Sequence, residues 1–554
     1  MRLIERRVGL VFALFLAGLA LAAVKSVWLG TVRANALSGA ATTQQEATIT
    51  VPARRGAITD RNGEELAVSQ PAMSVAATPY LISDPLATAR RIAPLLHRDQ
   101  GDVLADLSKQ DTGFVWLARK LAIQDAHRIQ AFKIEGLDFV EETTRTYPRT
   151  FVASQLLGFT GTDNTGLAGL EHRNDDDLRG RDGRRLLVKD ALGEPIRLDD
   201  ERRPRQGKTL QLTIDDRIQE ETEQVLAEVG ARYRPAKGAT AIVMDPQDGQ
   251  LLAVANWPRV DANRVHDAPE WAIQNRAVQT SYEPGSTFKA FTMAAALEDR
   301  KVTPDTTFQV PGQILVADRV IREAENETYG TLTASGIIQK SSNIGTVMIG
   351  QRLGATRFDH WVRRFGFGKA TGVDLPGEQT GIVLPREKYS GSSMGNLPIG
   401  QGEAVTPMQM AAAYSAIANG GVLRPPRIVK AIGGQATRTP RGRRVISTRT
   451  SSSLRTMLKG VLGPGGTASG AAIDGYALAG KTGTAQKPDP VLGGYSESKY
   501  VASFVGFAPA QNPRLLTLVM VDEPQGDIYG GSVAAPAWRE IMSFALNYLR
   551  IPPK

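Results

Sequence analysis

A serine and a lysine stand three residues apart in the stretch SYEPGSTFK, which runs from Ser281 to Lys289. The residues STFKAFTMAAALED after the Pro-Gly pair predict a helix that begins at Ser286, and side chains at i and i+3 share a helix face. Burial and the positive amino end of a helix both disfavour a protonated amine. A neutral Lys289 could therefore take the proton of Ser286 and make that hydroxyl a nucleophile without a histidine.

Two further motifs strengthen this interpretation, because a serine-lysine pair alone recurs by chance. The triplet Ser341-Ser342-Asn343 follows in a segment expected to be mostly helical. The run Lys481-Thr482-Gly483-Thr484 comes later, in AGKTGTAQ, whose pattern predicts a strand. A hydroxyl, an amide and a second amine thus join the first pair in a fixed order along the chain.

The third motif also matches a nucleotide-binding loop, since Gly475–Thr482 fits G-x-x-x-x-G-K-[ST]. Such a loop must follow a strand and open a helix whose amino end binds phosphate. Here the residues between the glycines are apolar and strand-like, and the following GTAQKPDPVLGG cannot form a helix. We therefore reject nucleotide binding by this segment.

The elements around the motifs predict a mixed α/β fold, of the α+β type in which helices pack on an antiparallel sheet. The residues after Asp215 have helical spacing, and Gly238–Pro258 reads as two strands joined by a DPQDG turn. A long insert follows, which we expect to be mostly helical. After it come three more strands and a last amphipathic helix, at Gly475–Ala485, Tyr500–Pro509, Arg514–Pro524 and Ala535–Leu549. This order predicts one antiparallel sheet with helices packed on it.

Composition excludes several classes of site. The 554 residues should form more than one domain, and 42% apolar with 22% charged residues is typical of folded protein. No cysteine is present, which excludes disulfides and thiolate chemistry, and the five histidines are scattered singly. We expect no metal site and no cofactor. The net charge of +9 comes without a compact basic-aromatic stripe, so we expect no nucleic-acid partner.

The amino terminus predicts a membrane anchor. Arginines in MRLIERR precede the uncharged run Val8–Val24, which can extend to Trp28 and so reaches the ~20 residues that cross a bilayer. Arginines on this side predict a cytoplasmic amino end and an external, periplasmic body. A cleaved signal peptide is the alternative, with a small-x-small site at Ala34–Ala36. We favour the uncleaved anchor, because the apolar run is long for a signal peptide.

Five further stretches complete a resemblance to the class B penicillin-binding proteins, the transpeptidases that cross-link bacterial peptidoglycan. They are RRGAITDRNGEELAVS (Arg54–Ser69), RTYP (Arg145–Pro148), GLAGLE (Gly166–Glu171), GQGEAVTPMQMA (Gly400–Ala411) and YGGSVAAPAW (Tyr529–Trp538). Together with S-x-x-K, S-x-N and K-T-G they span the chain in order. The resemblance implies a penicillin-binding serine-transpeptidase fold, with an antiparallel sheet flanked by helices, an elongated amino-terminal pedestal and one transmembrane helix.

The resemblance also implies three parts and a place in the cell. Residues 1–35 would form the cytoplasmic tip and anchor, 36–205 the pedestal of the dimerisation type, and 206–554 the transpeptidase domain. The residues that make up the motifs, SSN and KTGTA, resemble the septal, FtsI-like branch more than the elongation branch. Expected partners are stem peptides ending in D-Ala-D-Ala, β-lactams as inhibitors, the membrane, an FtsW-type glycosyltransferase and other division proteins.

The mechanism implied by the resemblance gives each motif residue a role. Ser286 would attack the penultimate carbonyl of the donor stem with Lys289 as base, and Ser341 would pass a proton to the leaving D-alanine. Asn343 would orient the substrate amide, while the strand Lys481–Thr484 would hold the terminal carboxylate through Lys481, Thr482 and Thr484, with Gly483 between them. The N–H groups of Ser286 and Thr484 would form the oxyanion hole.

Several alternatives stay open at this point. A class A β-lactamase would need a deacylating glutamate in an E-x-x-L-N pattern, which the segment between Ser341 and Lys481 does not contain. A D,D-carboxypeptidase differs only in its acceptor, and an elongation-type enzyme only in its place of work. A non-catalytic division scaffold or β-lactam sensor would not need all of Ser286, Lys289, Ser341, Asn343 and Lys481.

Overall fold

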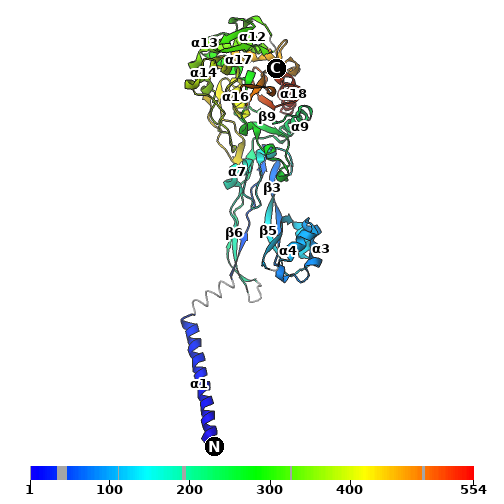
Figure 1. Ribbon diagram of the computed structural model, residues 1–554, viewed down its shortest axis with the longest axis vertical. Helices are drawn as coiled ribbons and strands as arrows, with labels where there is room; N and C mark the ends of the chain where they lie inside the picture. Colours follow the sequence, from blue (N-terminus) through cyan, green and yellow to red (C-terminus); the bar gives the residue numbers. More distant parts are fainter. Residues whose placement is uncertain are drawn as a thin grey trace. The chain divides into compact units, whose positions relative to one another are not determined.

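The structure is a computed structural model that describes residues 2–33, 46–109, 111–189, 195–324, 327–489 and 493–553 (Figure 1). The small-x-small site at Ala34–Ala36 lies outside the described residues. The chain divides into two compact units. The first comprises Met1–Arg54 and Gly180–Gly207, and the second comprises Arg55–Arg179 and Lys208–Lys554. The predicted boundary near residue 205 stays a prediction.

The first unit contains an apolar helix and a small sheet. Helix α1 spans Arg2–Thr31, and the 18-residue apolar window within its segment Arg6–Thr31 has a mean hydropathy of 2.3 and is not buried. At 1.5 Å per residue these 26 residues reach about 39 Å, more than the ~30 Å of a bilayer core. The helix is therefore consistent with a single-pass membrane anchor. Strands β1 (Glu46–Val51), β6 (Gly183–Lys189) and β7 (Pro195–Arg202) form an antiparallel sheet in this order.

The second unit begins with a mixed sheet that carries a small helical cluster. Its strand order is β17-β16-β8-β2-β3-β4, with β5 paired to β3. The strands span Gln435–Ala436, Val429–Ile432, Leu210–Leu212, Ile58–Thr59, Glu65–Ala77, Val115–Ala122 and, for β5, Leu137–Thr146. Helices α3 (Pro85–Leu96), α4 (Gln100–Leu107) and α5 (Ile123–Gln130) close a separate core with β3 and β4.

A five-stranded antiparallel sheet forms the centre of the second unit, which confirms the predicted fold class. Its order is β10-β9-β21-β20-β19, with these bounds: Leu251–Trp257, Gly238–Met244, Leu515–Asp522, Tyr495–Ala508 and Ala479–Pro488. Every residue of β9 and β21 is buried, because helices cover both faces. Helices α9 (Asp216–Tyr233) and α18 (Gly530–Tyr548) pack together on one face, and α16 (Pro407–Ala418) and α17 (Thr448–Leu462) on the other (Figure 1).

The long insert differs from its prediction in two ways. It contains short antiparallel pairs as well as helices: β11–β14 (Thr307–Val310 with Gly330–Thr333), β12–β13 (Gln313–Val316 with Arg319–Arg322) and β15–β18 (Val422–Leu423 with Arg443–Arg444). The helix predicted from Ser286 begins instead at Lys289, as α11 (Lys289–Glu298). Gly285–Phe288 form a 3-10 turn before it, in which i and i+3 still share one face.

Candidate functional site

The Ser286 turn packs directly against strand β19. Gly285 has a φ of +53°, and a side chain there would bring a Cβ within 3.0 Å of the Ala485 Cβ. A Cβ at Gly483 would lie 2.4 Å from the Ser503 Oγ and 2.9 Å from the Thr287 Cγ2, so this position of the strand requires glycine. The two glycines allow the approach of turn and strand that brings the first and third motifs together.

Lys289 is the first residue of α11 and is fully buried. Its Nζ donates hydrogen bonds to the Ser341 carbonyl oxygen at 2.5 Å and to the Asn343 Oδ1 at 2.7 Å. Burial lowers the pKa of Lys289 to about 7, against a weaker opposite effect of Glu323. A neutral amine has two N–H groups and one lone pair, so these two short bonds leave the lone pair free to accept a proton.

Ser341 and Asn343 lie at the junction of two helices. Ser341 ends α12 (Ala334–Lys340) in the left-handed conformation, with a φ of 59°, and Asn343 begins α13 (Asn343–Leu353). A non-glycine residue in this conformation is under strain, which is often found at functional sites. The bend directs the Ser341 carbonyl and hydroxyl and the Asn343 amide oxygen toward the lysines.

Lys481 approaches the same hydroxyl from strand β19. Its Nζ donates to the Ser341 Oγ at 2.8 Å, while the Lys289 Nζ lies 3.4 Å from that oxygen. Lys481 is fully buried, and burial with the nearby Lys289 charge holds its pKa well below the usual lysine range. Ser341 Oγ therefore bridges two amines that cannot both be protonated without mutual repulsion.

The remaining strand residues line the same side of the turn. Thr482 Oγ1 pairs with Thr467 Oγ1 at 2.9 Å, and Thr484 Oγ1 accepts the Gly530 N–H at 3.0 Å. The Thr484 hydroxyl hydrogen stays available to an anionic ligand, because its oxygen is the acceptor in that bond. The structure thus brings the eight residues predicted from the motifs to one region, although among the described residues Ser286 Oγ has no hydrogen-bond partner.

One carboxylate at this site was not predicted from the sequence. Glu323, which is 5% exposed, accepts hydrogen bonds from the backbone N–H groups of Asn343 at 2.6 Å and Ile344 at 3.2 Å, and from the Ser342 Oγ at 2.5 Å. It therefore caps α13 and fixes the position of the S-x-N triplet. Its neighbours in REAENE give no spacing signal, since its partners are mostly backbone groups about twenty residues away.

Comparison with known proteins identifies two domain families in the chain. Residues 239–543 match the penicillin binding protein transpeptidase domain family, and residues 50–212 match the penicillin-binding protein dimerisation domain family. The chain is 37% identical to stage V sporulation protein D of Bacillus subtilis, over 90% of this chain and 79% of that protein. It is 33% identical to peptidoglycan D,D-transpeptidase FtsI of Escherichia coli K12, over 91% of this chain and 85% of that protein.

A solved structure of a penicillin-binding protein is also similar to this chain. Penicillin-binding protein 3 of Mycobacterium tuberculosis, solved with aztreonam, is 31% identical and superimposes with a TM-score of 0.72, over 91% of this chain and 98% of that one. The two domain matches lie one after the other along the chain, over residues 50–212 and 239–543. The chain belongs to the class B penicillin-binding proteins, which join a dimerisation domain to a transpeptidase domain.

Proposed function

We propose that this protein is a septal peptidoglycan D,D-transpeptidase that works through a serine acyl-enzyme and is a target of β-lactams. The observation that carries the proposal is the position of the buried Lys289, which two acceptors hold at the start of α11, three residues after Ser286. A pKa of about 7 leaves a useful fraction of this amine neutral at physiological pH. The similarity to proteins named D,D-transpeptidases supports the same reaction.

In the acylation step Lys289 Nζ takes the proton of Ser286 Oγ as that oxygen attacks the penultimate D-alanine carbonyl. The carbonyl oxygen becomes an oxyanion, which the N–H groups of Ser286 and Thr484 receive as the oxyanion hole. Ser341 Oγ lies between the two lysine amines, so it can pass a proton from Lys289 to the departing D-alanine nitrogen. The amine of a second stem then attacks the ester and releases Ser286.

The substrate carboxylate completes the electrostatics of the site. Lys481 is buried and its pKa is low without a ligand, but an approaching carboxylate favours its protonated form. The charge on Lys481 then opposes protonation of Lys289, because the two amines share Ser341 Oγ. Binding of the donor would thus keep Lys289 in its basic form. Thr482 and Thr484 add hydroxyl donors, and Asn343 holds the peptide amide.

The septal role and the arrangement in the membrane are further parts of the proposal. Similarity to FtsI favours the septal branch over the elongation branch. Residues 1–35 would anchor the chain with a cytoplasmic amino end, 36–205 would form the pedestal, and 206–554 would work outside the membrane. The small residues of α1 offer a surface for packing against helices of an FtsW-type glycosyltransferase.

Fluorescent penicillin labelling of the full-length, detergent-solubilised protein tests the acyl-enzyme. Wild type should label stably, Ser286→Ala should not label, and Ser281→Ala, five residues upstream, should label as wild type does. Labelling that persists in Ser286→Ala would refute the assigned nucleophile. Rapid loss of the label from wild type would favour a β-lactamase, and no label on folded wild type would favour a non-catalytic scaffold.

Two assays separate the remaining alternatives. Purified protein supplied with lipid-linked strands should form cross-linked products, whereas a D,D-carboxypeptidase would release D-alanine without cross-links. Depletion in cells should block septation and give filaments, while an elongation-type enzyme would give round cells. Round cells after depletion would contradict the septal role and leave the transpeptidase reaction standing.

A further inference from the structure

A cavity in the catalytic part of the second unit has a strongly positive lining. It measures about 590 Å³ and is lined by residues of helices α14 (Ala355–Arg364) and α16 and of the strand pair β15–β18. None of the eight motif residues lines it. Six of the side chains that line it are cationic: Arg363, Arg364, Lys369, Arg424, Arg441 and Arg443. Among the described residues, none that lines the cavity is acidic.

Few of these charges are neutralised by the protein. Arg363 pairs with Asp359 at 3.0 Å, but among the described residues no other of the six forms an ion pair. Arg364 and Arg443 donate to backbone carbonyl oxygens, of Val445 and of Arg364 itself, which satisfies hydrogen bonds without removing charge. Like charges gathered in one concave site repel one another, and this arrangement is destabilising unless an anion joins them.

Arg424 also contributes a hydrogen-bond donor to this cavity. Its Nε is buried and has no hydrogen-bond partner in the described part of the chain. A buried polar group without a partner needs an explanation, and in a cavity lined by cations an anionic ligand would supply one. Arg441 is exposed and forms no described hydrogen bond, so its guanidinium is free to turn toward a ligand. The planar guanidinium of arginine can bind two phosphate oxygens at once through two parallel hydrogen bonds.

We propose that this cavity binds a phosphate or pyrophosphate ester. The rest of its lining includes the apolar side chains Phe365, Leu423 and Pro425, so the organic part of the ester has a surface to contact. The volume lies within the ~300–1,000 Å³ typical of small-molecule sites. A flat acidic protein surface would not enter such a hollow, and scattered arginines kept for solubility would not converge on one cavity.

Isothermal titration of the full-length protein in neutral detergent, with sodium pyrophosphate as the probe, tests the site. Wild type should bind one pyrophosphate per chain, with an affinity that falls as salt rises. The double variant Arg424→Gln/Arg441→Gln should weaken binding by about tenfold or more, since two charge-assisted contacts are removed. Arg441→Gln alone changes only an exposed side chain, and it should weaken binding in the same direction if the double variant does not fold.

A matched control separates a site from general attraction. Arg128→Gln/Arg264→Gln removes the same charge from side chains that are 69% and 75% exposed, outside the cavity, and should leave pyrophosphate binding unchanged. All variants should acylate with penicillin as wild type does. No saturable binding to wild type, or an equal loss in the control, would overturn the proposal.

Two other probes identify the source of the phosphate. Tighter binding of geranyl pyrophosphate than of pyrophosphate would indicate a lipid-linked ester that uses the apolar wall. Equal binding of the two would indicate a soluble phosphate. Binding of a single-stranded oligonucleotide, with no binding of either pyrophosphate, would overturn the proposal in favour of a nucleic-acid surface.

Discussion

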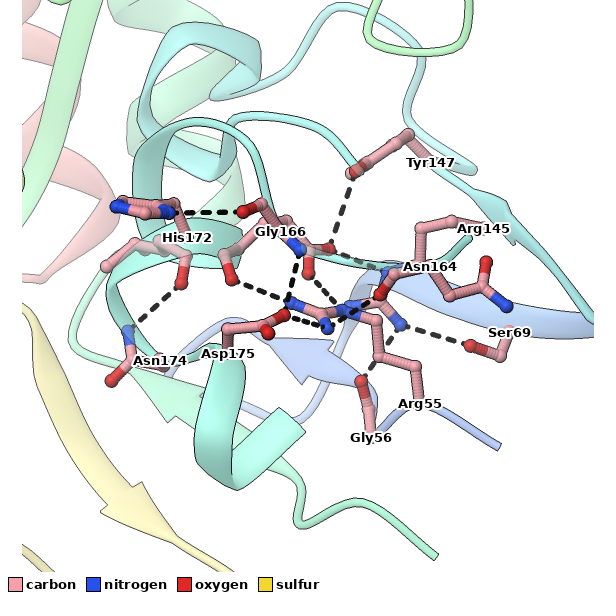
Figure 2. A network of polar contacts seen from close by, with 12 residues as sticks. Arg55, Gly56, Ser69, Arg145, Tyr147, Asn164, Gly166, His172, Asn174 and Asp175 are labelled. Carbon is pink, nitrogen blue, oxygen red and sulfur yellow. Dashed lines mark hydrogen bonds and ion pairs between the residues drawn. The ribbon is translucent and has the colours of Figure 1, made fainter. Parts of the chain in front are cut away.

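Two buried clusters of basic side chains in the second unit are built in opposite ways. In the first cluster, Arg55 and Arg145 each form an ion pair with the fully buried Glu171, and both Nε–Oε distances are 2.6 Å. Asp175 adds a second carboxylate at 2.5 Å from the Arg55 Nη1 (Figure 2). In the second, Lys289 and Lys481 are just as buried, but they share a serine hydroxyl instead of a carboxylate.

The difference follows from the chemistry of the two cations. A guanidinium keeps its proton in a protein, so a buried arginine is stabilised by a carboxylate that balances its charge. An ammonium can lose its proton, so a buried lysine can become neutral instead. The arginine cluster, with Tyr147 and Asn164 at its edge (Figure 2), therefore suits a structural role. The lysine cluster suits proton transfer.

Exchanging the type of cation should give the largest effect. Lys289→Arg would place a permanently charged group where the neutral amine stands, so the acylation rate with penicillin should fall roughly 10²–10⁴-fold, the usual contribution of a general base. Stopped-flow acylation and a thermal melt of the same sample would measure this. Lys487→Arg is the matched control, because Lys487 already pairs with Asp522 at 2.7 Å and needs its charge. Acylation by Lys289→Arg within tenfold of wild type would contradict the assigned base.

Breaking the arginine cluster should affect stability instead of chemistry. Glu171→Gln would leave two buried guanidinium groups facing a neutral amide, which should lower the free energy of unfolding by roughly 3–5 kcal/mol. The control Asp267→Asn breaks a surface pair with side chains 75% and 71% exposed, and should lower it by about 0–1 kcal/mol. Denaturant unfolding measures both. If both substitutions lowered the free energy of unfolding equally, the buried cluster would contribute no more to stability than a surface ion pair.

The two clusters also show what a sequence can predict. All of the lysine-cluster residues could be found, because S-x-x-K, S-x-N and K-T-G carry chemistry within a few residues each. The stretches that contain Arg55, Arg145 and Glu171 could be recognised too, but not their mutual contacts, since the partners lie 116 and 26 residues apart. Only the folded β3–β5 region makes them neighbours.

Other features depended on packing and could not be predicted. The antiparallel sheet followed from short apolar runs bounded by turn residues, whereas the start of α11 moved from Ser286 to Lys289 because the Gly285 turn must fit against Ala485. Glu323 had no motif, since it binds backbone N–H groups. The basic cavity likewise gathers arginines from separate segments between residues 363 and 443.

The pH dependence of acylation should follow the neutral form of Lys289. With a pKa of about 7, the rate should rise with pH and level off above about 7, and at pH 6 it should be roughly tenfold below the plateau. In the unfolded chain this lysine has its ordinary pKa of 10.5. Between about 7 and 10.5 the unfolded state therefore binds more protons, so this residue makes stability rise with pH across that window. A rate that falls between pH 6 and 8 would contradict the mechanism.

The smallest expected effect concerns a carboxylate near the lysine cluster, the kind of group that the arginine cluster contains and that Lys289 does not contact directly. Glu323 is the acidic group that raises the pKa of Lys289 against the effect of burial. Glu323→Gln keeps an amide oxygen that can accept from the Asn343 N–H, but removes the charge. The midpoint of the acylation profile should move to lower pH, with an about twofold higher rate at pH 6.

Two outcomes of that experiment have different meanings. Glu327→Gln, on an exposed acidic residue four positions away, is the control and should leave the midpoint unchanged. A midpoint that moves to higher pH in Glu323→Gln would mean that Glu323 does not act on Lys289 through its charge. An unchanged midpoint with a lower plateau would instead assign Glu323 to the geometry of α13 alone, since loss of its cap would displace Asn343 without altering the titration of the lysine.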